Sequence, residues 1–300
     1  MPDGFVVAVA SGKGGTGKTT IAVNLAQVVC ESGRKVQYLD CDVEEPNGHI
    51  FLRPEIAAKR QITVNVPQVD LQRCTACGLC GEICQYGAIV CIKDNVLVFE
   101  QLCHSCDGCV RICPDGAITA KSLEIGAVEC GSAGKIDFVS GKLNIGNVRT
   151  PALIREVKKH IRQDWLAIID VPPGTSCPVV EAVKGADFVL LVTEPTLFGL
   201  HDLKLAVELV RQLNLSFAVA INRDGVGNRD VEKYCQAQKI DIAFRLPDDR
   251  GIAEAYSSGK MIVDVLDNYR QQFLGVYDYL ERAKAKLDET RRFRVHGMNY

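Results

Sequence analysis

The sequence predicts an α/β fold with a mostly parallel central sheet, interrupted by a small inserted α+β segment. Continuous apolar runs, of which Phe5–Ala10 is the first, recur along the chain, and such runs are typical of parallel strands covered on both faces. Segments with helical spacing of apolar residues lie between these runs. From residue 65 to residue 120 the composition changes, because nine of the fourteen cysteines are concentrated there.

A glycine-rich loop joins the first predicted strand to a helix predicted over residues 20–31. The loop fits the phosphate-binding pattern G-x-x-x-x-G-K-[ST] between a strand and a helix, the context that this pattern requires. Its glycines let backbone N–H groups converge on phosphate oxygens, and the helix N-terminus adds a partial positive charge. Lys18 can reach the β- and γ-phosphates, and the Thr19 hydroxyl can bind Mg²⁺. The predicted nucleotide contacts are Gly12, Lys13, Gly14, Gly15, Thr16, Gly17, Lys18, Thr19 and Thr20.

An early lysine, Lys13, is additional to the general pattern. With it, the string K-G-G-T-G-K-T resembles the deviant Walker A loop of the MinD/ParA/Mrp ATPases, a family that also includes the nitrogenase iron protein and the arsenite-pump ATPase. This resemblance implies a P-loop NTPase fold that binds ATP and Mg²⁺. It also implies an ATP-dependent homodimer, in which Lys13 reaches the nucleotide bound by the other subunit. The alternative is that Lys13 is a solvated loop lysine.

Two further predicted strands end in carboxylates, at the edge where parallel sheets bind ligands. Residues 35–40 end at Asp40 and are followed by Asp42, and residues 165–170 end at Asp170 in the string D-V-P-P-G. The family resemblance implies that Asp42 orients the attacking water in the first switch, and that Asp170 supports the Mg²⁺ shell as the Walker B residue. Asp40 either supports the same shell or is purely structural. The predicted catalytic residues are therefore Lys13, Lys18, Asp42 and Asp170.

The second half of the chain continues the alternation of strands and helices. Helices are predicted over residues 152–163 and 200–213, strands over 188–193 and 217–222, and a last helical pattern over 273–287. By resemblance to the family, Asn222 and Arg223 provide the adenine-side contact, and Pro247 belongs to the second base-side loop. Asn222 is alternatively only a turn residue.

Eight cysteines form two runs with the same C-x-x-C-x-x-C-x-x-x-C spacing. This spacing is typical of bacterial ferredoxins with two [4Fe–4S] clusters, in which the fourth cysteine of each run binds the cluster of the other run. We therefore assign Cys74, Cys77, Cys80 and Cys113 to one cluster, and Cys103, Cys106, Cys109 and Cys84 to the other. Zinc is the chemical alternative, because C-x-x-C pairs also bind it. Cys91, between the runs, is predicted to be a small core residue on a strand.

These motifs predict two units. Residues 1–64 and 121–300 form the MinD/ParA-like ATPase domain, and residues 65–120 form an inserted ferredoxin-type domain. The insert carries three basic and six acidic side chains, a net charge of −3.

Composition excludes several other functions. A net charge of −2 gives no electrostatic case for nucleic-acid binding. No apolar run approaches the roughly 20 residues of a membrane span, and the basic string at residues 291–294 nearly lacks the apolar face needed for membrane attachment. The N-terminal apolar run leads into the phosphate loop and not into a cleavage site. We therefore expect a cytoplasmic protein without membrane insertion, whose cysteines bind metal and do not form disulfides.

The predicted function is that of an iron–sulfur ATPase, in which the nucleotide state controls electron transfer through the clusters to a redox partner protein. One alternative is a metallochaperone that helps to assemble an iron–sulfur or other metal cofactor on a partner. Carriers of the Mrp type use a C-x-x-C pair late in the chain, whereas Cys130 and Cys177 are single. The other alternative is a ParA-like positioning switch whose clusters are only structural.

Overall fold

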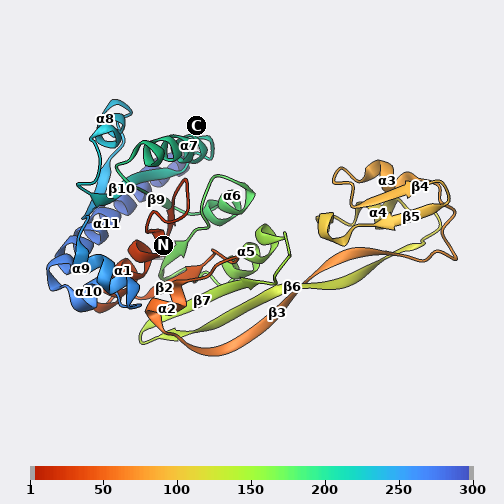
Figure 1. The fold of residues 1–300 in the computed structure, drawn as a ribbon, viewed down its shortest axis with the longest axis horizontal. Coiled ribbons are helices and arrows are strands. Elements are labelled where there is room, and N and C mark those ends of the chain that lie inside the picture. The colour runs from red at the N-terminus through yellow and green to blue at the C-terminus, as the bar shows by residue number, and fades with distance from the viewer. Residues whose placement is uncertain (1–3, 297–300) are drawn as a thin grey trace.

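A computed structural model describes residues 4–296, with side chains described for residues 4–289, and within it nine strands form one sheet (Figure 1). Seven neighbouring strands are parallel, so the predicted mostly parallel α/β sheet is confirmed. In spatial order they are β11 (Ile242–Pro247), β10 (Ser216–Asp224), β9 (Phe188–Thr193), β1 (Phe5–Ala10), β8 (Leu166–Asp170), β2 (Val36–Asp40) and β7 (Ile136–Leu143).

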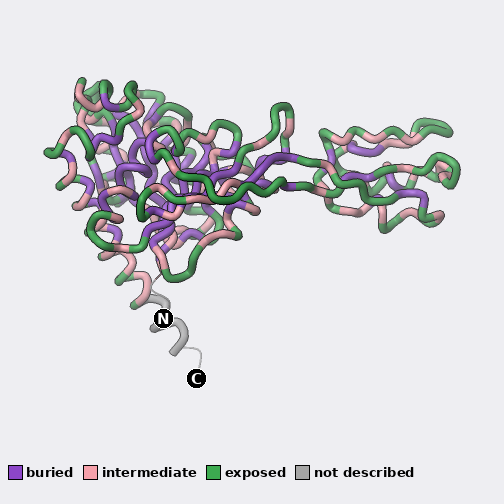
Figure 2. The backbone as a smooth tube through the Cα atoms, turned by 90° about the horizontal axis from the view of Figure 1, so that it is seen from below, coloured by how far each residue is buried: buried purple, intermediate pink, exposed green. Residues whose placement is uncertain are grey.

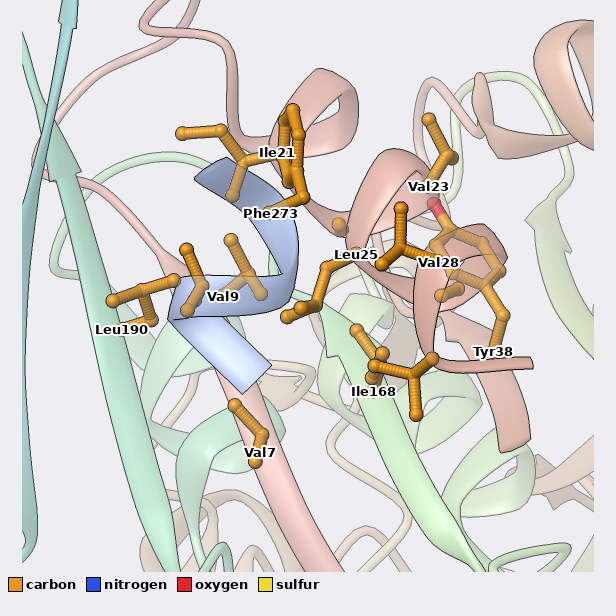
Figure 3. Packing of buried hydrophobic residues seen from close by; sticks show 14 of the residues in the cluster. Val7, Val9, Ile21, Val23, Leu25, Val28, Tyr38, Ile168, Leu190 and Phe273 are labelled. Atoms are coloured by element: carbon orange, nitrogen blue, oxygen red, sulfur yellow. The ribbon is translucent and has the colours of Figure 1, made fainter. Parts of the chain in front are cut away.

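Helices cover both faces of this sheet, and the side chains of β1 alternate between the two resulting cores. Val7 and Val9 pack on one face with Ile21 and Phe273 (Figure 3), whereas Ala8 faces the other core. The helices that contribute to the first core are α1 (Lys18–Glu31), α2 (Gly48–Leu52), α10 (Ile262–Val265) and α11 (Asp267–His296). Those that contribute to the second are α5 (Thr150–Lys158), α6 (Cys177–Val183), α7 (Leu197–Gln212) and α8 (Asp230–Ala237). A further helix, α9 (Arg250–Ser257), follows β11. We call the sheet with these helices the body.

Two long strands, β3 (Glu55–Val69) and β6 (Ile118–Ala133), complete the sheet at one edge and then leave it. They pair antiparallel with each other along their whole length, but β6 pairs with β7 only from Gly126 onward. The remainder projects from the body as a two-stranded ribbon (Figures 1 and 2). The domain boundaries predicted at residues 65 and 120 therefore fall inside continuous strands.

The end of the ribbon carries the cysteine-rich lobe, which we define as residues 70–117. It contains two short helices, α3 (Leu79–Ile83) and α4 (Gly108–Ile112), a hairpin of β4 (Ile89–Ile92) and β5 (Asn95–Val98), and one 3₁₀ turn, η1 (Glu100–Leu102). Buried segments are short in the lobe and extensive in the body (Figure 2). Cys80, Cys103 and Cys109 are among the few buried side chains of the lobe, so thiols form a large part of its interior.

Most predicted elements are present, with boundaries shifted by a few residues. The last helix, predicted over 273–287, spans Asp267–His296, and the helix predicted over 152–163 ends earlier, at Lys158. Beyond it the chain bonds to β2 instead of continuing the helix, because Gln37 donates to the carbonyl of His160 and accepts from the Arg162 N–H. No helix in the described part of the chain is long and apolar enough to cross a membrane. The side chains of residues 291–294, considered above for membrane attachment, lie outside the described residues.

Candidate functional site

A cavity of about 440 Å³ lies at the carboxyl ends of the parallel strands, where the phosphate loop meets the loop after β2 and the last residues of β10 and β11. It is lined by residues that were predicted from four separate segments of the sequence. These are Gly14, Gly15, Gly17, Lys18, Thr19 and Thr20 of the phosphate loop, together with Asp42, Asn222, Arg223 and Pro247. Gly12 and Thr16 do not line the cavity, and Gly12 instead packs against the backbone of Asp202.

The shape of the phosphate loop is held by a contact with Asn222. The Asn222 side-chain amide donates to the carbonyl of Thr16 at 2.8 Å, and its oxygen accepts from the Arg223 N–H at 3.0 Å. Gly17 has a φ of 91°, and a Cβ at this position would lie 2.3 Å from the Asn222 amide nitrogen. Residue 17 must therefore be glycine for both steric and conformational reasons. Asn222 braces the loop in addition to lining the cavity.

Lys18 and Asp170 form the buried polar centre of this site. Lys18 is 6% exposed, and Asp170 is fully buried with one carboxylate oxygen accepting from the Tyr38 hydroxyl at 2.9 Å. The other oxygen, Oδ1, has no hydrogen-bond partner among the described residues. Burial raises the pKa of Asp170, while the Thr19 hydroxyl and the charge of Lys18 act in the opposite direction. In P-loop sites Mg²⁺ is held by the loop Ser/Thr, a carboxylate and the substrate phosphates. Thr19 and the unpaired oxygen of Asp170 fit this donor set.

Two cavities in the lobe are each lined by four of the eight repeated cysteines. One, of about 320 Å³, is lined by Cys84, Cys103, Cys106 and Cys109. The other, of about 10 Å³, is lined by Cys74, Cys77, Cys80 and Cys113. The last cysteine of each run thus lies with the first three of the other run.

Backbone N–H groups contact two of these thiols. Backbone N–H groups of Ser105 and Ala117 donate to the sulfurs of Cys103 and Cys113 at 3.4 and 3.3 Å, and such bonds tune cluster potentials. Among the side chains of residues 4–289, no group of three or more His, Cys, Asp or Glu is arranged to hold a metal ion. All fourteen cysteines are free thiols. Four thiols around each cavity are the donor set of a [4Fe–4S] cluster, so the residues present fit this cofactor.

Comparison with known proteins agrees with this architecture. Residues 7–262 match the family model described as the CobQ/CobB/MinD/ParA nucleotide binding domain. The chain belongs to this family. It is 31% identical, over 91% of its length and 97% of the relative's, to an uncharacterized protein of Methanocaldococcus jannaschii. It is also 24% identical, over 86% of its length and 79% of the relative's, to an iron-sulfur cluster carrier protein of Pyrococcus abyssi.

Among solved structures, the fold is similar to that of the septum site-determining protein MinD, complexed with Mg-ADP, from Pyrococcus horikoshii. The TM-score is 0.60 at 20% sequence identity, and the similarity covers 95% of this chain and 98% of that one. This similarity extends only to the fold.

In this MinD/ParA-family chain, the two carboxylates after β2 differ in their surroundings. Asp40 is fully buried and accepts from the backbone N–H groups of Asp42 and Gly48 at 3.2 and 3.0 Å. These bonds shape the turn after β2, which favours the structural alternative for Asp40. Asp42 lines the nucleotide cavity. Burial and the charge of Asp170 raise the pKa of Asp42 to about 7, against the opposing effect of Lys18.

This raised pKa predicts how stability depends on pH in the nucleotide-free protein. Between about pH 4, the ordinary pKa of Asp, and about pH 7, Asp42 ionises in the unfolded chain but stays protonated in the folded protein, so the folded protein loses stability as the pH rises, and above about pH 7 this loss is constant. The Asp42→Asn variant does not have this loss. It should therefore unfold at a temperature a few degrees higher than the wild type at pH 8, with an advantage that shrinks toward pH 5. Thermal unfolding midpoints measured across this pH range test the effect, and a difference independent of pH would contradict it.

Glu194, which was not predicted, lies between two predicted nucleotide-binding residues. Its carboxylate is buried, with Oε2 3.5 Å from Lys13 Nζ and Oε1 3.0 Å from Arg223 Nη1. Lys13 therefore has an acidic partner within its own chain. A signal for Glu194 was available, since this acid directly follows the buried strand β9 at the same edge of the sheet as Asp40 and Asp170.

The remaining cysteines lie outside both lobe cavities. Cys91 lies on β4, as predicted, half-buried, and its thiol donates to the carbonyl of Ala76 at 3.4 Å. Cys177 is exposed at the start of α6, and Cys130 is half-buried on β6. Sequence reasoning also missed an aromatic pair beside the larger cavity, where Tyr86 and His104 stack with ring centroids 3.6 Å apart.

Proposed function

We propose that this protein is an iron–sulfur ATPase that couples its nucleotide state to electron transfer through two [4Fe–4S] clusters, delivering electrons to a redox partner protein. The observation that supports this most strongly is the grouping of eight lobe cysteines into two sets of four, each around its own cavity. The lobe that carries them is attached by two strands, β3 and β6, whose other ends belong to the nucleotide-binding sheet.

In the proposed reaction, water attacks the γ-phosphate of ATP in line with the leaving group. Lys18 and the N–H groups of the phosphate loop bind the phosphates and stabilise their charge, and Thr19 and Asp170 would hold Mg²⁺. When bound, Mg²⁺ neutralises charge that develops on the phosphates. Asp42 orients the attacking water by accepting its hydrogen bond. Asn222, Arg223 and Pro247, which line the cavity, would contact the base.

In the lobe, the two sets of cysteines would each hold one cluster, which supplies reversible one-electron chemistry. The lobe buries few apolar side chains besides its thiols. A unit of about 50 residues gains too little from hydrophobic burial to be stable without metals, disulfides or a larger neighbour. Thiolate–iron bonds would supply the missing stability. The proposed domains are therefore an ATPase of residues 1–64 and 121–300 and a ferredoxin-type insert of residues 65–120, joined through the ribbon.

A second candidate is a metallochaperone that passes clusters to an acceptor protein. It is favoured by the similarity to a relative named as an iron-sulfur cluster carrier protein. The two candidates differ in the fate of the clusters. Electron transfer predicts that the clusters stay bound through repeated reduction and oxidation, whereas carriage predicts their transfer to an apo-acceptor in the presence of ATP. Iron analysis of the protein after such cycles separates the two.

The proposed dimer is tested by replacing Lys13 with alanine. Light scattering should give a dimer mass for the wild type with Mg²⁺ and a non-hydrolysable ATP analogue, and a monomer mass for Lys13→Ala. Nucleotide binding should remain, because Lys13 does not line the cavity of its own chain. ATP hydrolysis should fall on the order of 10³-fold, the effect of a cation supplied in trans to a transferring phosphoryl group. A wild type that stays monomeric, or a variant that hydrolyses ATP normally, would remove the role of Lys13 in trans.

A further inference from the structure

One arginine of the body is buried against the backbone of the cysteine-rich lobe. Arg149 directly precedes α5 and is only 7% exposed. Its Nε donates to the carbonyl of Cys103 at 3.0 Å, and its Nη2 donates to the carbonyl of Glu100. The Glu100 carbonyl also accepts from the N–H of Cys103. Arg149 therefore fixes the peptide that carries one of the four thiols around the larger cavity.

The next residue along the chain contacts the nucleotide site. Thr150, the first residue of α5, donates its hydroxyl hydrogen to Glu44 Oε1 at 2.6 Å. Glu44 belongs to residues 42–45, the first switch segment, which begins with Asp42 of the nucleotide cavity. The neighbouring Val43 carbonyl accepts from the Leu143 N–H at 2.8 Å, so this segment is also bonded to the end of β7.

The remainder of α5 is bonded to α6, the helix that follows β8 and its last residue, Asp170. The Lys158 ammonium donates to the carbonyls of Glu181 and Ala182, and Arg155 forms an ion pair with Glu181 at 3.1 Å. Glu181 and Ala182 lie on α6, which begins a few residues after Asp170. Helix α5 is therefore bonded to segments after both Asp42 and Asp170, and its N-terminus is bonded to the lobe.

We propose that Arg149 and Thr150 form a relay that transmits a change in the first switch segment to the peptide of Cys103. Arg149 is the positioning residue of this relay. This inference rests on the proposed function for its redox consequence, because Cys103 must bind a cluster for the relay to affect one. It concerns the set Cys84, Cys103, Cys106 and Cys109, whose backbone Arg149 contacts.

The charge of Arg149 gives the relay an electrochemical effect. A guanidinium is always protonated, and the lobe it enters has a net charge of −3. Reduction adds negative charge to a cluster, so a buried cation nearby favours the reduced form and raises the reduction potential. If movement of residues 42–45 shifts α5, the distance between this charge and the cluster changes with the nucleotide state.

Hydrogen exchange tests the relay without requiring catalysis. In the wild type, exchange of the backbone amides in residues 100–106 should change at least threefold between the nucleotide-free protein and the protein with Mg²⁺ and a non-hydrolysable ATP analogue. The Thr150→Val variant has nearly the same shape but lacks the hydroxyl that bonds Glu44. It should bind nucleotide normally and lose the change in residues 100–106. Identical exchange in the wild type with and without nucleotide, or a full response in Thr150→Val, overturns the relay.

Potentiometric titration of the cluster-loaded protein tests the role of the charge. Arg149→Gln should lower the reduced-to-oxidised ratio of one cluster at least tenfold at a fixed potential. For a one-electron couple this corresponds to a reduction potential lower by about 59 mV. The potential of the other cluster should not change. Arg149→Lys should restore most of this potential. Lys121→Gln is the matched control, because it removes an exposed cation that pairs with the side chain of Glu100. An equal shift in the control, or none in Arg149→Gln, contradicts the role of Arg149. If the purified protein binds no clusters, the proposed function is contradicted. The hydrogen-exchange experiment does not need clusters and would still test the relay.

Discussion

Replacing Lys18 with alanine is expected to lower the affinity for ATP by at least about 100-fold and to abolish hydrolysis. Lys18 is buried and lines the cavity, where its ammonium would replace water around bound phosphates. A hydrogen bond to a charged group contributes about 1.5–3 kcal/mol, and every 1.4 kcal/mol corresponds to a tenfold change in affinity. The loss should exceed one such bond, because removing Lys18 also leaves Asp42 and Asp170 without a compensating cation. Calorimetric titration with ATP and Mg²⁺ measures the change.

Lys13→Ala is the matched control for this variant. Both changes remove one lysine from the same loop, but Lys18 lines the cavity and Lys13 does not. Lys13→Ala should therefore keep an affinity within a few-fold of the wild type. If Lys18→Ala also binds ATP with nearly normal affinity, the phosphates do not lie in this loop.

Replacing Cys84 with serine is expected to remove the cluster of the other cysteine run. Anaerobically purified wild type should contain roughly eight iron and eight sulfide per chain, the sum of two [4Fe–4S] clusters. Cys84→Ser should retain about half of this iron. The thiol of Cys84 shares its cavity with Cys103, Cys106 and Cys109, so the cluster lost should be theirs.

Double variants show which cluster each cysteine serves. Adding Cys106→Ser to Cys84→Ser should remove no further iron, because both thiols line one cavity. Adding Cys77→Ser should remove nearly all of it, because Cys77 lines the other. Cys91→Ser, from the strand between the runs, should keep the full content. The opposite result in the two double variants would mean that each run binds its own cluster. Zinc in place of iron, without broad visible absorption, would exclude the ferredoxin interpretation.

The predictions that agree with the structure rest on local patterns. The phosphate loop, the turn after β2 and the last residues of β10 each follow a continuous apolar run, and parallel strands end at a common edge. Sequence patterns alone therefore singled out Lys18, Asp42, Asn222 and Pro247, and the structure shows that all four line one cavity. The spacing of the cysteine runs similarly anticipated that Cys84 and Cys113 would exchange places between the two sets.

The ribbon and its contacts had no such local signal. Ten of the fifteen residues of β3 are exposed, and residues 55–61 have no buried face, so apolar and polar residues alternate only over the short run 62–66. Its partner β6 lies about 60 residues later in the chain, and this pairing is set by tertiary structure. Arg149 was missed for a related reason. A single arginine before a helix is ordinary in sequence, and its role arises only from contacts with Glu100 and Cys103, more than 40 residues away.

The ribbon also determines how the lobe can move. About eight residues of β6 extend beyond its pairing with β7, which at about 3.3 Å per residue makes an arm of about 25 Å. Held by this arm alone, the lobe would act as the end of a lever, and a bend of about 10° at the sheet would carry it about 4 Å. The Arg149 contact adds a second point of attachment, which leaves only rotation about the line joining the two points. The two hydrogen bonds of Arg149 therefore determine whether the lobe is held at two points or only through the ribbon.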